Sequence, residues 1–216
     1  MTRTTCLYRS LLLVCFCYVA LGRASADSLT LSGSFAADNS TFDYTLTTTS
    51  MQDFTFYTTS YGGGLNANGT TTSAGGFVPV LTLFSPTGTV IDLGGAGGTC
   101  GGTSNADPST GLCNDAKFSD VLAPGTYNLV LSEFPNVPVG KLSDGFLFSA
   151  DPTATGDVCG VSGGTFLEAD VAPCVQRRSN YTVNISSPSA VPEPSTWLLV
   201  LPAAAVLFVY GRRQLA

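Results

Sequence analysis

The middle of the chain consists of short alternating segments separated by turn residues, and this pattern restricts it to β structure. In Tyr127–Leu131 and in Tyr181–Ile185 every second residue is apolar, which is typical of half-buried strands. Ser85–Gly88 places Pro and Gly where a tight turn needs them. Away from the two ends, no stretch keeps helical periodicity over the roughly eleven residues that indicate a helix.

The same pattern predicts the positions of the strands. They cover Ser28–Phe35, Thr41–Leu46, Asp53–Thr59, Pro79–Ser85, Thr89–Leu93, Lys117–Leu122, Thr126–Glu133, Phe146–Ser149 and Asn180–Ser186. Tight turns join antiparallel neighbours, and the spacing shows no strand–helix–strand units. We therefore predict an all-β fold, an antiparallel β-sandwich of jelly-roll type. An N-terminal signal helix and a C-terminal single transmembrane helix are expected to flank it.

Charged residues make up only 11% of the chain, against roughly 25% in typical soluble domains. Between residues 27 and 190 the chain has four basic and fourteen acidic side chains, a net charge of −10. Nucleic acid and anionic lipid surfaces both bind Lys and Arg patches, so an acidic domain argues against them as partners. The acidic surface is compatible with cation binding, or it keeps an exported domain soluble.

Residues 1–26 have the order of a secretory signal peptide. Arg3 and Arg9 precede an apolar run at Leu11–Leu21, and a small-residue cleavage site ends at Ala26. The apolar run is too short to span a bilayer comfortably. We expect cleavage after Ala26, so that the β domain covers 27–188. The cysteines removed with the signal peptide are Cys6, Cys15 and Cys17.

Residues 189–216 combine a short motif, an apolar stretch and a basic cluster. The motif is Pro192-Glu193-Pro194, and the apolar stretch covers 197–210. At about 1.5 Å per residue this stretch is about 21 Å long, short of the roughly 30 Å hydrocarbon core. The basic pair that follows would be held on the cytoplasmic side; it consists of Arg212 and Arg213. We predict a transmembrane helix over 197–210 that acts as a transient anchor.

This tail resembles the PEP-CTERM sorting signal of Gram-negative bacteria. The motif, the apolar helix, the Arg pair and their distance from the C-terminus all agree with that family, as does the signal peptide. The resemblance implies processing by an exosortase, a membrane transpeptidase-like enzyme. It also implies association with extracellular polymeric substance and biofilm. The expected route is export, transient residence in the inner membrane, and then the cell surface or extracellular matrix.

The middle of the chain is similar to a second family. Phe54–Gly64, Pro79–Gly88 and Leu122–Leu131 follow one another as they do in β-sandwiches of the bacterial pre-peptidase C-terminal type. The resemblance covers about residues 50–150 and implies a jelly-roll fold with a non-catalytic accessory or binding role. Members of this type often have an Asp before the equivalent of Pro79, where this chain has Val78.

Four cysteines remain after removal of the signal peptide: Cys100, Cys113, Cys159 and Cys174. An even count in an exported chain indicates disulfides, and three connectivities are possible. We favour Cys100–Cys113 with Cys159–Cys174, because each pair brackets a Gly-rich loop. The alternative is a four-thiolate zinc site, but the chain has no C-x-x-C spacing and no His.

Few residues suggest catalysis or metal binding. Because the chain has no His, it has no Ser-His-Asp or Cys-His arrangement. A pair of carboxylates could still act as acid and base; the candidates are Glu133, Asp144, Asp151 and Glu168. A Ca²⁺ site would need six to eight oxygens, and the best candidates are Asp115 (beside Asn114), Asp144 and Asp151. Aromatic residues in strands either stack on sugar rings or belong to the core; those in question are Tyr57, Tyr61 and Tyr181.

These observations favour a structural or interaction protein that is not an enzyme. We expect it to be exported, to be processed by an exosortase, and to associate with the exopolysaccharide matrix. A polysaccharide- or Ca²⁺-binding module is the alternative, and a carboxylate-based hydrolase is a third possibility. The expected partners are an exosortase, the membrane through the C-terminal helix, and exopolysaccharide.

Overall fold

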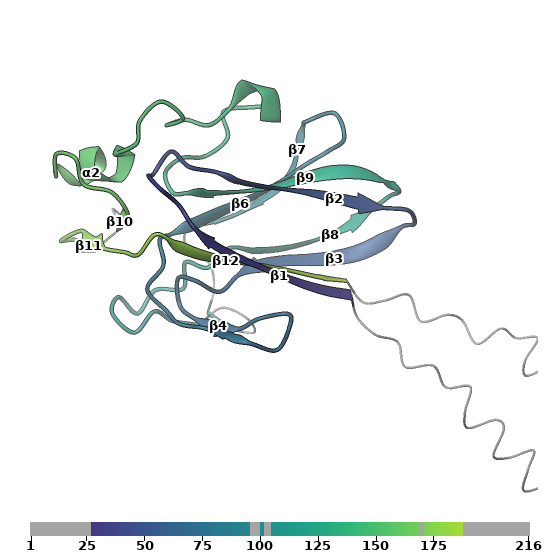
Figure 1. Ribbon diagram of the computed structural model, residues 1–216, viewed down its shortest axis with the longest axis horizontal. Helices are drawn as coiled ribbons and strands as arrows, with labels where there is room; N and C mark the ends of the chain where they lie inside the picture. Colours follow the sequence, from purple (N-terminus) through teal and green to yellow (C-terminus); the bar gives the residue numbers. More distant parts are fainter. Residues whose placement is uncertain (1–26, 96–99, 102–104, 169–170, 188–216) are drawn as a thin grey trace, which may run out of the picture. The chain divides into compact units, whose positions relative to one another are not determined.

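Two antiparallel four-stranded sheets face each other in the computed structural model of the chain (Figure 1). The structure describes residues 27–95, 100–101, 105–168 and 171–187. One sheet has the order β1 (Asp27–Ser34), β12 (Asn180–Ser187), β3 (Gln52–Thr58) and β8 (Lys117–Leu122). The other has the order β2 (Phe42–Thr48), β9 (Gly125–Glu133), β6 (Pro79–Phe84) and β7 (Val90–Gly94). The all-β, antiparallel prediction is confirmed, while the jelly-roll connectivity stays a prediction.

Smaller elements lie outside the two sheets. They are the hairpin β4 (Gly64–Leu65) with β5 (Thr71–Thr72), the pair β10 (Leu167–Glu168) with β11 (Val175–Gln176), the 3₁₀ turn η1 (Leu142–Asp144) and the helix α2 (Ala154–Cys159). The sequence did not indicate any of them, because each is too short to show a period. In the described ranges no helix is long and apolar enough to cross a bilayer. The predicted signal peptide, sorting motif and transmembrane helix all lie outside the described residues.

The core lies between the sheets and is built by alternate side chains of each strand. Phe54 and Phe56 of β3 face Leu129 and Leu131 of β9 within one buried cluster. Phe35 stacks on Phe77 with 4.9 Å between ring centroids, and this pair extends the cluster beyond the strands. Successive side chains of a strand point to opposite faces of the sheet, so burial of one face produces the period-two pattern. Eight of the nine strands predicted from this pattern are present.

The prediction of a strand at Phe146–Ser149 is wrong. Phe146 makes only an isolated bridge to Pro138, and the Ser149 N–H then bonds the Phe146 carbonyl oxygen in a local turn at 3.1 Å. The Phe148 N–H is taken by the side chain of Asn136 at 2.8 Å. Because these backbone N–H groups already have local partners, they are not free to form a hydrogen-bond ladder with a neighbouring strand.

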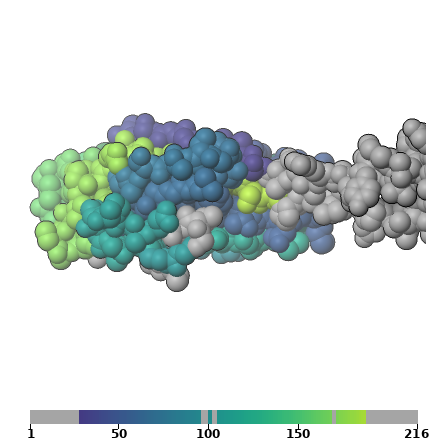
Figure 2. All heavy atoms as spheres, turned by 90° about the horizontal axis from the view of Figure 1, so that it is seen from below, coloured from purple at the N-terminus to yellow at the C-terminus, as the bar shows by residue number. Residues whose placement is uncertain are grey.

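A polar interface buries the outer face of β12. Thr182 and Asn184 alternate with apolar core residues, a pattern that usually puts polar side chains in water, yet both are buried. The β4–β5 hairpin covers them: the Ala67 N–H donates to Asn184 Oδ1 at 2.9 Å, and Thr72 bonds Thr182. Figure 2 looks onto the face where the blue part of the chain, around residues 60–75, forms much of the surface.

Replacement of Asn184 by Ala tests this interface. Its Oδ1 accepts hydrogen bonds from Thr30 and from the Ala67 N–H, so Asn184→Ala leaves buried groups without partners. We expect a loss of about 2 kcal/mol in the free energy of unfolding, measured by urea titration with circular dichroism. Asn128→Ala on the half-buried surface of β9 is the matched control and should change stability by less than about 0.5 kcal/mol. Equal losses in the two variants would contradict the proposed role of the interface.

Candidate functional site

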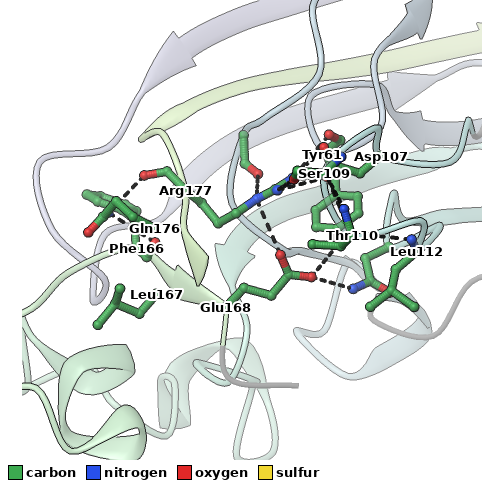
Figure 3. Close-up of polar contacts among 12 residues, drawn as sticks. Tyr61, Asp107, Ser109, Thr110, Leu112, Phe166, Leu167, Glu168, Gln176 and Arg177 are labelled. Carbon is green, nitrogen blue, oxygen red and sulfur yellow. Dashed lines mark hydrogen bonds and ion pairs between the residues drawn. The ribbon is translucent and has the colours of Figure 1, made fainter. Parts of the chain in front are cut away.

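A buried cluster of charged and polar groups centres on Arg177, just after β11 (Figure 3). Its guanidinium forms two parallel contacts with Asp107, Nη1 to Oδ1 at 3.1 Å and Nη2 to Oδ2 at 3.0 Å. Its Nε lies 3.5 Å from Oε2 of Glu168. The guanidinium carbon also lies 4.3 Å from the centre of the Tyr61 ring, and the Tyr61 hydroxyl donates to Glu168. Arg177, Asp107, Glu168 and Tyr61 are hereafter the Arg177 cluster.

The cluster joins four segments that are far apart in the sequence. Tyr61 follows β3, Asp107 lies in the loop before β8, Glu168 belongs to β10, and Arg177 follows β11. The backbone supports the arrangement, because Arg177 Nε also donates to the Gly76 carbonyl oxygen at 2.9 Å. Sequence reasoning selected Tyr61 and Glu168 separately, but nothing local linked them to Arg177 or Asp107.

Within the Arg177 cluster, Asp107 and Arg177 stay charged and Tyr61 stays neutral across the neutral pH range. Burial alone would raise the pKa of Asp107, but hydrogen bonds from Arg177 and Ser109 outweigh it and hold that pKa well below its ordinary value. Burial would lower the pKa of Arg177, and Asp107 reverses this so that the pKa is raised. Burial and the bond to Glu168 raise the pKa of Tyr61. These three groups therefore do not change protonation near neutral pH, which fits a structural role.

Asp115 organises the chain where β3 ends. Its carboxylate accepts hydrogen bonds from Thr58 Oγ1 at 2.8 Å, from the Tyr61 N–H at 3.1 Å and from the Gly62 N–H at 2.8 Å. Burial raises the pKa of Asp115 in spite of these donors. At Gly62 a Cβ would sit 1.9 Å from the Asn105 carbonyl oxygen, so only glycine allows this approach. The oxygens predicted for calcium are therefore engaged by protein donors.

The other calcium candidates serve local turns. Asp144 is exposed and accepts the Lys141 N–H at 2.8 Å. Asp151 accepts the N–H and hydroxyl of Thr153 at 2.9 and 3.1 Å. In the part of the chain that the structure describes, no three acidic or Cys side chains converge as metal ligands. Calcium binding stays a prediction.

The carboxylates suggested for acid–base chemistry do not share an accessible site. Glu133 and Glu168 are both buried, the first beside Asp38 and the second in the Arg177 cluster. General acids and bases must reach the proton they transfer. The two buried candidates do not face solvent, and Asp144 and Asp151 hold turns. The rings considered for sugar stacking are also buried; they are Tyr57, Tyr61 and Tyr181.

Both favoured cysteine pairs lie at disulfide distance. The Cα atoms of Cys100 and Cys113 are 5.2 Å apart, and those of Cys159 and Cys174 are 6.1 Å apart. The second pair joins the last residue of α2 to the residue before β11. It therefore restrains the region that supplies Glu168 and Arg177 to the cluster.

A groove opens between the sheets where β1 and β3 begin and β2 and β12 end. Figure 1 shows these strand ends at the end of the sandwich away from α2. It has a volume of about 340 Å³ and includes no charged side chain. Its lining comes from β1, β2, β3 and β12: Ser28, Leu29, Tyr44, Leu46, Thr47, Gln52, Phe54, Ile185 and Ser187. Sequence reasoning missed the groove, because four strands from both ends of the domain must meet to form it.

Removal of Arg177 tests the cluster. Arg177→Ala would leave Asp107 and Glu168 buried without their counter-charge, and we expect a loss of about 3–5 kcal/mol in the free energy of unfolding. The neighbouring Arg178 is exposed, so Arg178→Ala is the matched control and should cost less than about 1 kcal/mol. Urea titration followed by circular dichroism measures both. Similar losses for the two arginines would contradict the role assigned to Arg177.

The pKa of Asp107 adds a pH dependence to the same comparison. Since the folded-state pKa is lowered, its stabilisation is present above the ordinary value of 3.8 and is lost as pH falls through the folded-state pKa. We expect the difference in stability between the Arg178→Ala and Arg177→Ala chains to shrink in acid below about pH 4. A difference that grows as pH falls would contradict this sign.

Comparisons with known proteins identify the tail. Residues 190–214 match the family of the PEP-CTERM protein-sorting motif. No curated protein matches the sequence significantly. Among solved structures, the pre-peptidase C-terminal domain of collagenase from Bacillus anthracis is similar at 13% identity, with a TM-score of 0.33, over 74% of this chain and 88% of that chain. The chain thus carries the PEP-CTERM protein-sorting motif at residues 190–214, as its Pro-Glu-Pro sequence and terminal arginines indicated.

Proposed function

We propose that this chain is an exported cell-surface protein whose tail is processed by an exosortase, and whose β domain is a non-catalytic structural or interaction component of the exopolysaccharide matrix. The single observation that carries the proposal is the match of residues 190–214 to the PEP-CTERM sorting motif. The signal peptide predicted at residues 1–26 supports export, and the apolar stretch 197–210 would hold the chain transiently in the inner membrane.

Two properties of the β domain support this assignment. Two cysteine pairs at disulfide distance suit an oxidising compartment outside the cytoplasm. The most deeply buried carboxylates serve the fold, through the Arg177 cluster and through Asp38 and Glu133, which gives little basis for a hydrolase. A domain held together in this way provides a stable surface rather than a reactive centre.

The sorting motif can be tested in the native host. We expect the replacement of Pro192, Glu193 and Pro194 by Ala to leave the tail uncut, so that the full-length chain accumulates in the inner-membrane fraction. Immunoblotting against the β domain and mass spectrometry of the C-terminus measure this outcome. A strain without exosortase should give the same product from the natural sequence. Normal tail processing of the altered chain would contradict the proposal.

The groove favours neutral-saccharide binding as a second candidate function. Its lining includes the apolar side chains of Leu46, Phe54 and Ile185, whereas Gln52 supplies a side-chain amide. A sugar ring has an apolar face and a rim of hydroxyl groups, so a mixed site without charge suits it. An anionic polysaccharide would be repelled by the acidic domain as a whole.

Substitutions in the groove test this second candidate. We expect Tyr44→Ala and Gln52→Ala each to weaken binding to the neutral fraction of the host's matrix polysaccharide on the order of tenfold, as loss of a central contact does. Isothermal titration calorimetry measures the affinity. Leu65→Ala, exposed on the β4–β5 hairpin, is the control. Unchanged affinity in both groove variants would exclude the groove as the binding site.

A further inference from the structure

Two carboxyl groups meet inside the domain, away from the Arg177 cluster. Asp38 lies between β1 and β2 and is 1% exposed, and Glu133 ends β9 and is 2% exposed. The two groups interact as hydrogen-bonding partners, although neither ionised carboxylate has a proton to donate. Two buried carboxylates in hydrogen-bond contact cannot both be ionised without a compensating charge.

Asp38 is the acceptor of the pair. Its carboxylate receives hydrogen bonds from the Thr155 N–H at 2.8 Å, from the Thr155 hydroxyl at 2.6 Å and from the Phe166 N–H at 2.8 Å. Three donors leave one further position on its two oxygens. Glu133 has no comparable support, and its Oε2 lacks a hydrogen-bond partner. A proton on Glu133 would supply the fourth hydrogen bond to Asp38.

Among the residues that the structure describes, no ion pair supplies a positive charge in place of that proton, because both ion pairs belong to Arg177, which is engaged by Asp107 and Glu168. Burial first, and then the charge of Asp38, raise the pKa of Glu133 to about 10. Other acidic groups on the segments around Asp38 are Asp151, Asp157 and Glu168, and none of them contributes to the shift.

Asp38 attaches a separate part of the chain to the sandwich. Residues 152–168, hereafter the α2 arm, contain α2 and β10. The Asp38 N–H donates to the Pro152 carbonyl oxygen at 3.2 Å. Its carboxylate holds Thr155 in α2 and Phe166 just before β10. One acidic side chain therefore anchors both halves of the arm.

We propose that Asp38 and Glu133 share a single proton, carried by Glu133 and donated to Asp38, and that this proton latches the α2 arm onto the sandwich. Loss of the proton to solvent places two negative charges in contact, and their repulsion displaces the Asp38 carboxylate from its three donors in the α2 arm. The latch is closed at neutral pH and opens in alkali. The inference does not depend on the proposed function.

The sign of the pH dependence follows from linkage. The folded chain keeps a proton that the unfolded chain releases once pH exceeds the ordinary pKa of 4.5 for Glu133. The folding equilibrium constant therefore falls as pH rises from there toward about 10, by up to roughly tenfold per pH unit for one proton. Above the folded-state pKa this dependence ends.

Replacement of Glu133 by Gln tests the latch in the full-length chain. The Gln amide donates to Asp38 as the protonated acid does, but it cannot ionise. Urea titrations between pH 5 and 10 should show the folding constant of the natural chain falling by up to roughly tenfold per pH unit relative to that of Glu133→Gln. Hydrogen exchange of residues 152–168, corrected for the intrinsic effect of pH, should accelerate above about pH 9 in the natural chain alone.

Two further measurements keep the inference falsifiable. Asp120 also has a pKa raised by burial, and then by Asp92 and Asp53, but it lies on β8, so Asp120→Asn should leave exchange in the α2 arm unchanged. Equal pH slopes for the natural chain and Glu133→Gln would overturn the shared proton. A second result would also overturn it: Ca²⁺ at neutral pH slows hydrogen exchange in the α2 arm, EDTA reverses this effect, and Glu133→Gln abolishes it. A cation would then occupy the position assigned to the proton.

Discussion

The charge balance around Arg177 is the interaction on which the rest of the domain depends. The sandwich strands are joined by their own ladders, but the loops after β3, before β8 and around β10 and β11 have few ladder bonds. Arg177 brings these loops to one place through Asp107, Glu168 and the face of Tyr61. In a low dielectric the three charges are tolerable only together, so each of these loops fixes the position of the others.

Polar residues do much of the packing in this domain. The chain has few charged side chains but many Thr, Ser and Asn, and several of these are fully buried. Asn184 and Thr182 bind the β4–β5 hairpin to the outer face of one sheet, and Asp115 binds the start of the loop that leads into it. Hydrogen bonds inside the protein fix geometry more sharply than apolar contacts, because an unpaired donor or acceptor costs free energy. The domain is thereby suited to hold a defined surface.

The positions of the buried carboxylates also bear on function. Glu133 and Glu168, which looked like candidates for acid–base chemistry, are occupied in the interior by Asp38 and by Arg177. The groove, in contrast, carries no charge and opens between the sheets. The sorting motif at residues 190–214 and the neutral groove are therefore the two features on which the proposed functions rest.

Local sequence patterns were enough to predict most strands, the sorting motif and the cysteine pairs. Period-two alternation and Pro-Gly turns placed eight strands, and the Pro-Glu-Pro tail identified the sorting motif. The Gly-rich loops that the cysteines bracket favoured the two pairs. Each of these signals lies within a few neighbouring residues. Where local pattern failed, at Phe146–Ser149, the backbone groups were taken by Asn136 and by a turn. The Arg177 cluster, the Asp38–Glu133 pair and the groove arose only from folding, because a carboxylate's partners come from segments with no fixed spacing. Whether a charged side chain is buried depends on which distant segments pack around it, and no local sequence period indicates this.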